Sequence, residues 1–149
     1  MWMLVRANAL GSESPDGSGS RTLAACPDSP ERGDPWRWTI SRNDSTGQLG
    51  LDISSEPDHI WVQTRQYADG YTGPLHRAAG TQLVIASLRG EALVAAASGP
   101  WERWLRPGDI FVVEGEEDED LRLSLPEGDS CVEVVSLAPR LTHALRWVP

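Results

Sequence analysis

The clearest pattern along the chain is a series of short stretches in which apolar and polar residues alternate. In residues 36–42, WRWTISR, one face carries Trp36, Trp38 and Ile40, and polar side chains occupy the other. Residues 59–67, HIWVQTRQY, alternate in the same way. A period of two residues is typical of a strand with one buried face. Both stretches are therefore predicted to be half-buried strands.

Continuous apolar runs bounded by Gly and Pro turns fill most of the second half of the chain. They are QLVIASL (82–88), EALVAAA (91–97), WERWL (101–105), IFVV (110–113), LRLSL (121–125) and SCVEVVSLA (130–138). A shorter apolar segment, SRTLAAC, covers residues 20–26. No stretch between residues 36 and 138 has a helical period. We expect roughly nine or ten short strands in an all-β sandwich or barrel.

Polar loops separate these elements. Gly, Ser, Pro and Asp dominate residues 11–20, 26–35 and 43–50. The acidic run from Glu114 to Asp120 is predicted to be a solvated loop, because like charges at this density repel one another. A site for a hard cation such as Ca²⁺ or Mg²⁺ is the alternative interpretation, although the run lacks the spacing of a known loop.

Composition narrows the function classes. The 149 residues suit one domain, and the net charge is −9. Every basic side chain except histidine is Arg, so Schiff-base chemistry and a P-loop lysine are excluded. A negative chain without clustered cations argues against nucleic acid as a partner. Because there is no apolar run long enough for a signal peptide or a membrane span, we expect a cytoplasmic protein with no membrane partner.

Three segments, in order, carry a resemblance to a known family. They are GPLHRAAGTQLVIASLRGEALV (73–94), WLRPGDIFVV (104–113) and CVEVVSL (131–137). Together they resemble the cupins, small antiparallel jelly-roll barrels. The resemblance implies one cupin barrel over residues 59–139, inside a single domain 1–149. Residues 1–58 would then be strands and loops that pack on the barrel, and residues 140–149 a C-terminal arm.

The N-terminal third carries a narrower resemblance. Residues 4–41, with the segments SGSRT and WRWTIS, resemble the start of HutD/Ves-type proteins, bicupins associated with histidine utilisation. This chain has SPDGSGS where that family has a Trp-Lys-Asn-Gly-Gly-Gly stretch, and it is shorter than a bicupin. The resemblance implies a shortened protein that binds a small molecule.

The cupin resemblance also concerns metal ligands. In metal-binding cupins the first motif supplies two His and a carboxylate, and the second motif supplies one more His. Here His76 matches one His position, Gln82 stands near the carboxylate position, and Asp118 or Glu119 falls near the last His position. One imidazole does not make the nitrogen-rich site that Fe, Mn or Zn prefers, so we expect no metal and no cofactor. The alternative is a 2-His-1-carboxylate set that includes His59.

Strand alternation suggests which residues line a cavity. We expect His76 to share a side with Ala78, and Gln82, Val84, Ala86 and Leu88 to continue that side. A second face combines polar and aromatic side chains, namely His59, Trp61, Gln63, Arg65 and Tyr67. It is predicted either to line the cavity or to form the surface of a homodimer, and ordinary solvent exposure is the remaining alternative.

Three further residues belong to the candidate site. Trp36 and Trp38 are expected to fill the core or to form a pocket wall. Glu133 alternates with apolar positions in residues 130–138. If it is buried, its carboxyl group would suit general acid–base work. The alternative is an outward-facing position at a sheet edge.

The predicted function is a redox-neutral reaction, a cyclisation or isomerisation, of a small hydrophobic metabolite held inside a metal-independent barrel. The catalytic candidates are His76, Glu133 and Arg65. The ligand-binding candidates are Trp36, Trp38, Trp61, Gln63, Tyr67 and Gln82. Non-catalytic binding of a small molecule is the alternative, and a metal-dependent oxygenase or isomerase is third. A buried His76 beside a carboxylate would favour catalysis, whereas a cavity with Arg and no acid–base pair would favour binding of an anion.

Overall fold

The computed structural model describes residues 2–5, 12–13, 20–25, 36–55 and 60–139, with side chains in 37–55 and 60–139. These residues form thirteen strands in three antiparallel sheets and no helix, so none of them forms a helix that could cross a membrane. The predicted all-β class is confirmed.

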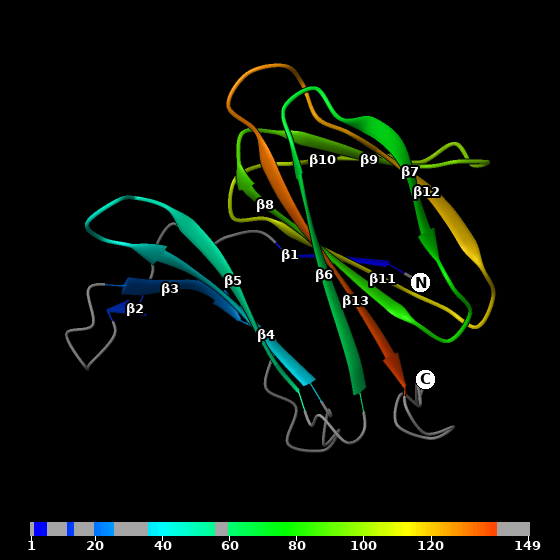
Figure 1. Ribbon diagram of the computed structural model, residues 1–149, viewed down its shortest axis with the longest axis horizontal. Coiled ribbons are helices and arrows are strands. Elements are labelled where there is room, and N and C mark those ends of the chain that lie inside the picture. Colours follow the sequence, from blue (N-terminus) through cyan, green and yellow to red (C-terminus); the bar gives the residue numbers. More distant parts are fainter. Residues whose placement is uncertain (1, 6–11, 14–19, 26–35, 56–59, 140–149) are drawn as a thin grey trace.

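The three sheets differ in position and size (Figure 1). The central sheet has the order β1 (Trp2–Val5), β11 (Ile110–Glu114), β8 (Gln82–Arg89), β13 (Cys131–Pro139) and β6 (Ile60–Ala68). The outer sheet has the order β10 (Glu102–Leu105), β9 (Ala92–Ala96), β12 (Glu119–Ser124) and β7 (Thr72–Arg77). The N-terminal sheet has the order β2 (Ser12–Glu13), β3 (Ser20–Ala25), β4 (Trp36–Asn43) and β5 (Leu49–Ser55).

The first hydrophobic core lies between the central and outer sheets. Leu83 and Ile85 of β8, and Phe111 of β11, are buried there against Leu121 and Leu123 of β12. Trp101 packs against this core, and its ring centroid lies 5.7 Å from that of Phe111. This core therefore joins the two sheets in which the predicted site residues after position 59 reside.

A second core lies on the opposite face of the central sheet. Trp38 and Ile40 of β4 pack there against Val84, Ile110 and Val135 of the central strands. The central sheet is thus covered on both faces, by the outer sheet and by the N-terminal sheet. A strand buried on both faces needs apolar side chains at every position, which explains the unbroken runs in β8 and β11.

The PGD sequence makes the expected sharp turn into β11. Gly108 has a φ of 93°, a conformation that favours glycine at the third position of a type II turn. The amide of Asp109 donates to the carbonyl of Arg106 over 2.9 Å, and the buried Asp109 carboxylate accepts from the Arg106 amide over 2.8 Å. The turn is therefore closed from both directions.

The sequence-based boundaries were wrong in two places. Residues 43–50 were assigned to one loop, but Leu49 already begins β5, whose Leu51 and Ile53 pack on the second core. The acidic run is not a continuous loop either, since Glu114 ends β11 and Glu119 begins β12. In addition, the described strands do not close into one barrel, because β6 pairs only with β13 and β7 only with β12.

Candidate functional site

A cleft of about 350 Å³ opens where the central and outer sheets part. Its two sides are β6 and β7, which follow one another in sequence but lie at the free edges of different sheets. The residues that line it are Gln63, Arg65, Tyr67, Pro74, Leu75, His76, Leu83, Val134 and Ser136. We call this set the edge cleft.

Period-two alternation in β6 delivers one side of the edge cleft. Arg65 pairs with Val134 of β13, and Gln63 pairs with Ser136. Directly paired residues in an antiparallel sheet share a face, so these side chains lie on the side of the first core. Gln63, Arg65 and Tyr67, which were expected on one face, therefore come together in the cleft.

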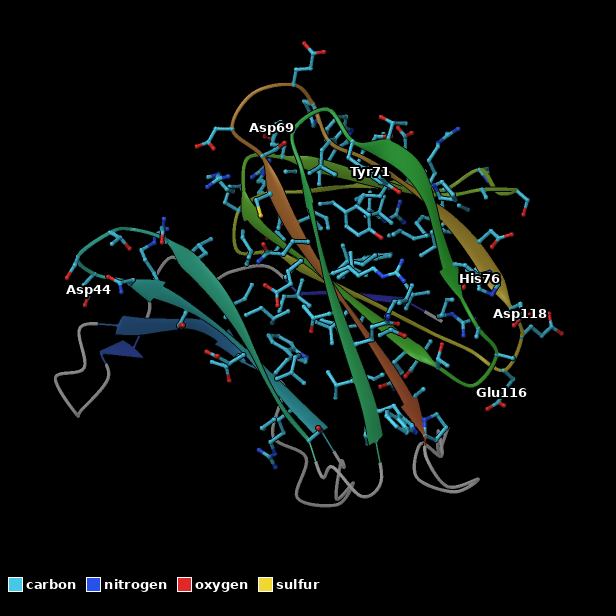
Figure 2. All side chains as sticks on the ribbon, in the orientation of Figure 1. Asp44, Asp69, Tyr71, His76, Glu116 and Asp118 are labelled. Atoms are coloured by element: carbon cyan, nitrogen blue, oxygen red, sulfur yellow. The ribbon has the colours of Figure 1, made fainter. Side chains whose placement is uncertain are left out.

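An aromatic pair stands at the end of the cleft nearest the β6–β7 turn. The ring centroids of Tyr67 and Tyr71 lie 4.5 Å apart with a tilt of 49°. The Tyr71 hydroxyl donates to the carbonyl of Pro74 over 3.4 Å. Figure 2 shows Asp69 and Tyr71 at this turn, with His76 farther along β7. The tyrosines thus connect the two sides of the cleft at this end.

A side-chain contact ties the same turn to Ser130, the residue before β13. One carboxylate oxygen of Asp69 accepts from the backbone amide of Ser130 over 2.5 Å and from the Ser130 hydroxyl over 3.1 Å. The backbone hydrogen bond is the largest reason that the pKa of Asp69 lies below its ordinary value. The contact therefore ties the turn that joins β6 to β7 to the start of β13.

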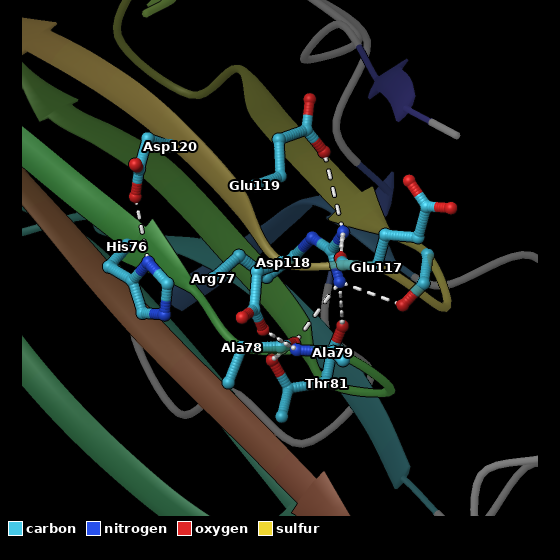
Figure 3. A network of polar contacts seen from close by, with 10 residues as sticks. His76, Arg77, Ala78, Ala79, Thr81, Glu117, Asp118, Glu119 and Asp120 are labelled. Carbon is cyan, nitrogen blue, oxygen red and sulfur yellow. Dashed lines mark hydrogen bonds and ion pairs between the residues drawn. The ribbon is translucent and has the colours of Figure 1, made fainter.

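His76 lies on the β7 side and has a carboxylate partner. Its Nδ1 is 2.7 Å from Oδ1 of Asp120, the residue that faces it across the β7–β12 pair (Figure 3). The two side chains are 59% and 67% exposed. When the neutral ring carries its proton on Nδ1, the carboxylate accepts that proton's hydrogen bond and leaves Nε2 as an acceptor. The pair is therefore suited to proton transfer at the rim of the cleft.

Arg77, the next residue, holds the acidic segment in place. Its side chain is 2% exposed and donates to the carbonyls of Gly115 at 2.8 Å and Glu117 at 2.6 Å (Figure 3). The same guanidinium reaches the carbonyls of Ala78 and Thr81 at 3.2 and 3.1 Å. The predicted solvated loop is thus a tethered connection whose carboxylates Glu116, Glu117 and Asp118 face solvent.

Two predicted site residues lie on the wrong face for the edge cleft. Leu83 lines the cleft, so Gln82 points the other way, and its amide donates to Glu114 over 2.6 Å. Glu133 pairs with Ala86 of the second core, so it is also directed away from His76. The expected shared side of His76, Gln82 and Val84 was wrong. Gln82 lies on the same face as Val84, which packs in the second core, whereas His76 lies on the exposed face of β7, opposite to Leu75.

The tryptophans do not gather around the cleft. Trp38 is 1% exposed in the second core, so it is a core residue rather than a wall of this cleft. Trp61 precedes Gln63 on the cleft side of β6 but is 60% exposed and does not line the cleft. The side chain of Trp36 and all of His59 lie outside the described residues, and with them the alternative two-histidine metal set. Within the described part of the chain, no three His, Cys, Asp or Glu residues are grouped to hold a metal ion.

Several residues of the site were not singled out from the sequence. Ser136 and Val134 occupy the face of β13 opposite Glu133, so the period-two pattern contained the signal. Asp120 lies 44 positions after His76 and meets it only through strand pairing, for which no local pattern exists. Arg77 lies two positions after the apolar Leu75, so the two share a face of β7, and this spacing was a signal for an inward-facing cation.

Comparison with known proteins adds no assignment. The chain matches no protein-family model, and a search of curated proteins finds no significant relative. The resemblance to cupins and to HutD/Ves-type proteins consequently stays a prediction.

Proposed function

We propose that the protein binds a small, partly apolar organic molecule in the edge cleft. The observation that carries this proposal is the lining, which joins the apolar Leu75, Leu83 and Val134 to the polar Gln63 and Arg65. Small-molecule sites typically combine an apolar surface with a few polar groups, and about 350 Å³ lies within their usual range. The turn at residues 106–109 and the antiparallel neighbours β8, β11 and β13 support a cupin jelly roll as the fold family.

The binding proposal is tested with a cleft-filling substitution. We expect Gln63→Trp to weaken binding of 2-naphthamide, a neutral aromatic probe, by about tenfold or more, because the indole would occupy the cleft. Gln66→Trp is the matched control, since Gln66 is also exposed on the same strand but points to the other face. Ligand-observed NMR titration gives the dissociation constants. Equal affinities in both variants, or no binding to the wild type, would contradict the proposal.

A second candidate is a redox-neutral cyclisation or isomerisation in the same cleft. The 2.7 Å contact between His76 and Asp120 favours it, because a carboxylate that holds one ring nitrogen prepares the other to accept a proton. Glu133 has no part in this version, since it lies on the other face of the central sheet. Arg65 would orient the substrate, and positioning contributes to ring closure by holding reacting atoms together.

The catalytic candidate is tested by the tautomer of His76. In the neutral wild-type ring, we expect the proton to lie on Nδ1. In Asp120→Ala the population should move towards the Nε2–H form, as measured by the ¹⁵N chemical shifts of the ring nitrogens. Asp118→Ala is the control, because that carboxylate accepts from the Ala79 amide and not from His76. An Nε2–H ring in the wild type would exclude His76 as the base.

A further inference from the structure

The edge cleft contains a cation, Arg65, that has no counter-charge among the described residues. Among the described residues no carboxylate pairs with Arg65, whereas Arg77 contacts Glu119 at 3.5 Å and Arg89 contacts Asp129 at 2.5 Å. A guanidinium presents five N–H donors in a planar fork that matches a carboxylate. Arg65 therefore brings unused donors and a positive charge to the side of the cleft.

The lining contains no acidic residue to neutralise that charge. Acidic residues outnumber Arg by 22 to 13 in the whole chain, yet none is among the nine that line the cleft. Asp120, which faces His76 on the neighbouring strand, is in contact with that histidine and is not part of the lining. The local charge of the cleft is thus opposite to the net charge of the chain, and screening limits the effect of remote acids to about 8–10 Å at ordinary salt.

The neighbours of Arg65 suit a carboxylate with an apolar body. Gln63 and Ser136, paired across β6 and β13, offer neutral donors beside the guanidinium. Leu83 and Val134 form an apolar surface next to them, and Val134 is the direct cross-strand partner of Arg65. A single cation beside an apolar floor matches one negative charge, since a second charge on the ligand would lack a partner.

We propose that the edge cleft recognises a singly charged organic anion, a carboxylate bound by Arg65 with its aromatic or branched body against Leu83 and Val134. This inference rests on the proposed function and names the ligand class for the same cleft. It assigns Arg65 a role in charge recognition that does not depend on His76.

Two probes of the same shape test the charge preference. 2-Naphthoate and 2-naphthamide share one ring system and differ in charge. We expect the wild type to bind 2-naphthoate about tenfold more tightly, a modest preference because Arg65 is solvent-exposed. Arg65→Gln should bring the two affinities close together, and Arg65→Lys should keep part of the preference because the charge remains without the fork. Arg42→Gln, which removes an exposed arginine from the N-terminal sheet, should leave the preference unchanged.

The outcomes separate this inference from the proposed function. Equal affinity of the wild type for both probes, or a preference that survives Arg65→Gln, would overturn anion recognition by Arg65. Binding of 2-naphthamide that is lost in Gln63→Trp would still support the cleft as a binding site. Failure of both probes to bind the wild type would instead overturn the proposed function itself. Added salt gives an independent check, because it should reduce the preference for 2-naphthoate and leave 2-naphthamide binding nearly constant.

Discussion

Replacing Arg77 with methionine is expected to lower the free energy of unfolding by about 3 kcal/mol. The side chain is 2% exposed, and its guanidinium donates to carbonyl oxygens on both strand connections that meet at the end of β7. Methionine keeps much of the apolar stem but removes every donor. The measurement is urea unfolding of the wild type and the variant. The two midpoints are compared when both proteins have the same slope of unfolding free energy against urea concentration.

The size of this effect follows from which carbonyls lose their last partner. The Ala78 carbonyl also accepts from Thr81, and the Gly115 carbonyl also accepts from the Gly80 amide at 2.9 Å. Among the described residues, the carbonyls of Thr81 and Glu117 have no donor other than Arg77, so these two groups carry most of the penalty. The Nε atom of Arg77 is buried without a partner among the described residues. Removing this unsatisfied group partly offsets the loss of stability in Arg77→Met. The expected value is therefore at the low end of the 3–5 kcal/mol typical of a broken buried charge site.

Arg122→Met is the matched control for Arg77→Met. Arg122 lies on the neighbouring strand β12 but is exposed, so its replacement should change stability by no more than about 0.5 kcal/mol. A loss below about 1 kcal/mol in Arg77→Met would contradict the interpretation, because it would mean that water replaces the guanidinium at these carbonyls. Gly115→Ala offers a second test of the same contact, since a Cβ at Gly115 would lie 2.9 Å from the Arg77 guanidinium.

The sequence predicted where the strands lie better than it predicted which of their side chains share a cavity. Alternation placed Gln63, Arg65 and Tyr67 on one face because a strand preserves its period from end to end. It failed between His76 and Gln82 because β7 and β8 belong to different sheets. The side of β7 that faces away from the first core is exposed, whereas the corresponding side of β8 packs in the second core. β5 was missed although Leu49, Leu51 and Ile53 alternate, because its Gly-containing start was assigned to the preceding loop.

One part of the candidate site could be predicted from the sequence and another part could not. Its β6 side follows from a local pattern that any reader of residues 59–67 can find. The contact of His76 with Asp120 requires the pairing of β7 with β12, which joins residues 44 positions apart. Glu133 shows the same limit. Its alternation with apolar residues fits either face of β13, and the face that borders the cleft is known only once the sheets on both sides of the central sheet are known.

Replacing Trp38 with alanine is expected to lower the free energy of unfolding by about 3–5 kcal/mol. Trp38 is 1% exposed and packs with Ile40 of the N-terminal sheet against the central strands. Its removal would leave a cavity between two sheets whose backbones are each fixed by strand pairing, so the site has little freedom to collapse. Thermal and urea unfolding of the variant provide the measurement.

Two further substitutions show whether the Trp38 effect arises from packing. Trp104→Ala should cost about 1 kcal/mol or less, because Trp104 is 48% exposed on β10. Trp38→Phe should cost less than Trp38→Ala, on the order of 1 kcal/mol, since phenylalanine fills much of the space and also removes an indole N–H that is buried without a partner among the described residues. Equal losses in Trp38→Phe and Trp38→Ala would contradict this account, because they would indicate that the indole nitrogen, and not the packed ring, stabilises the contact between the two sheets.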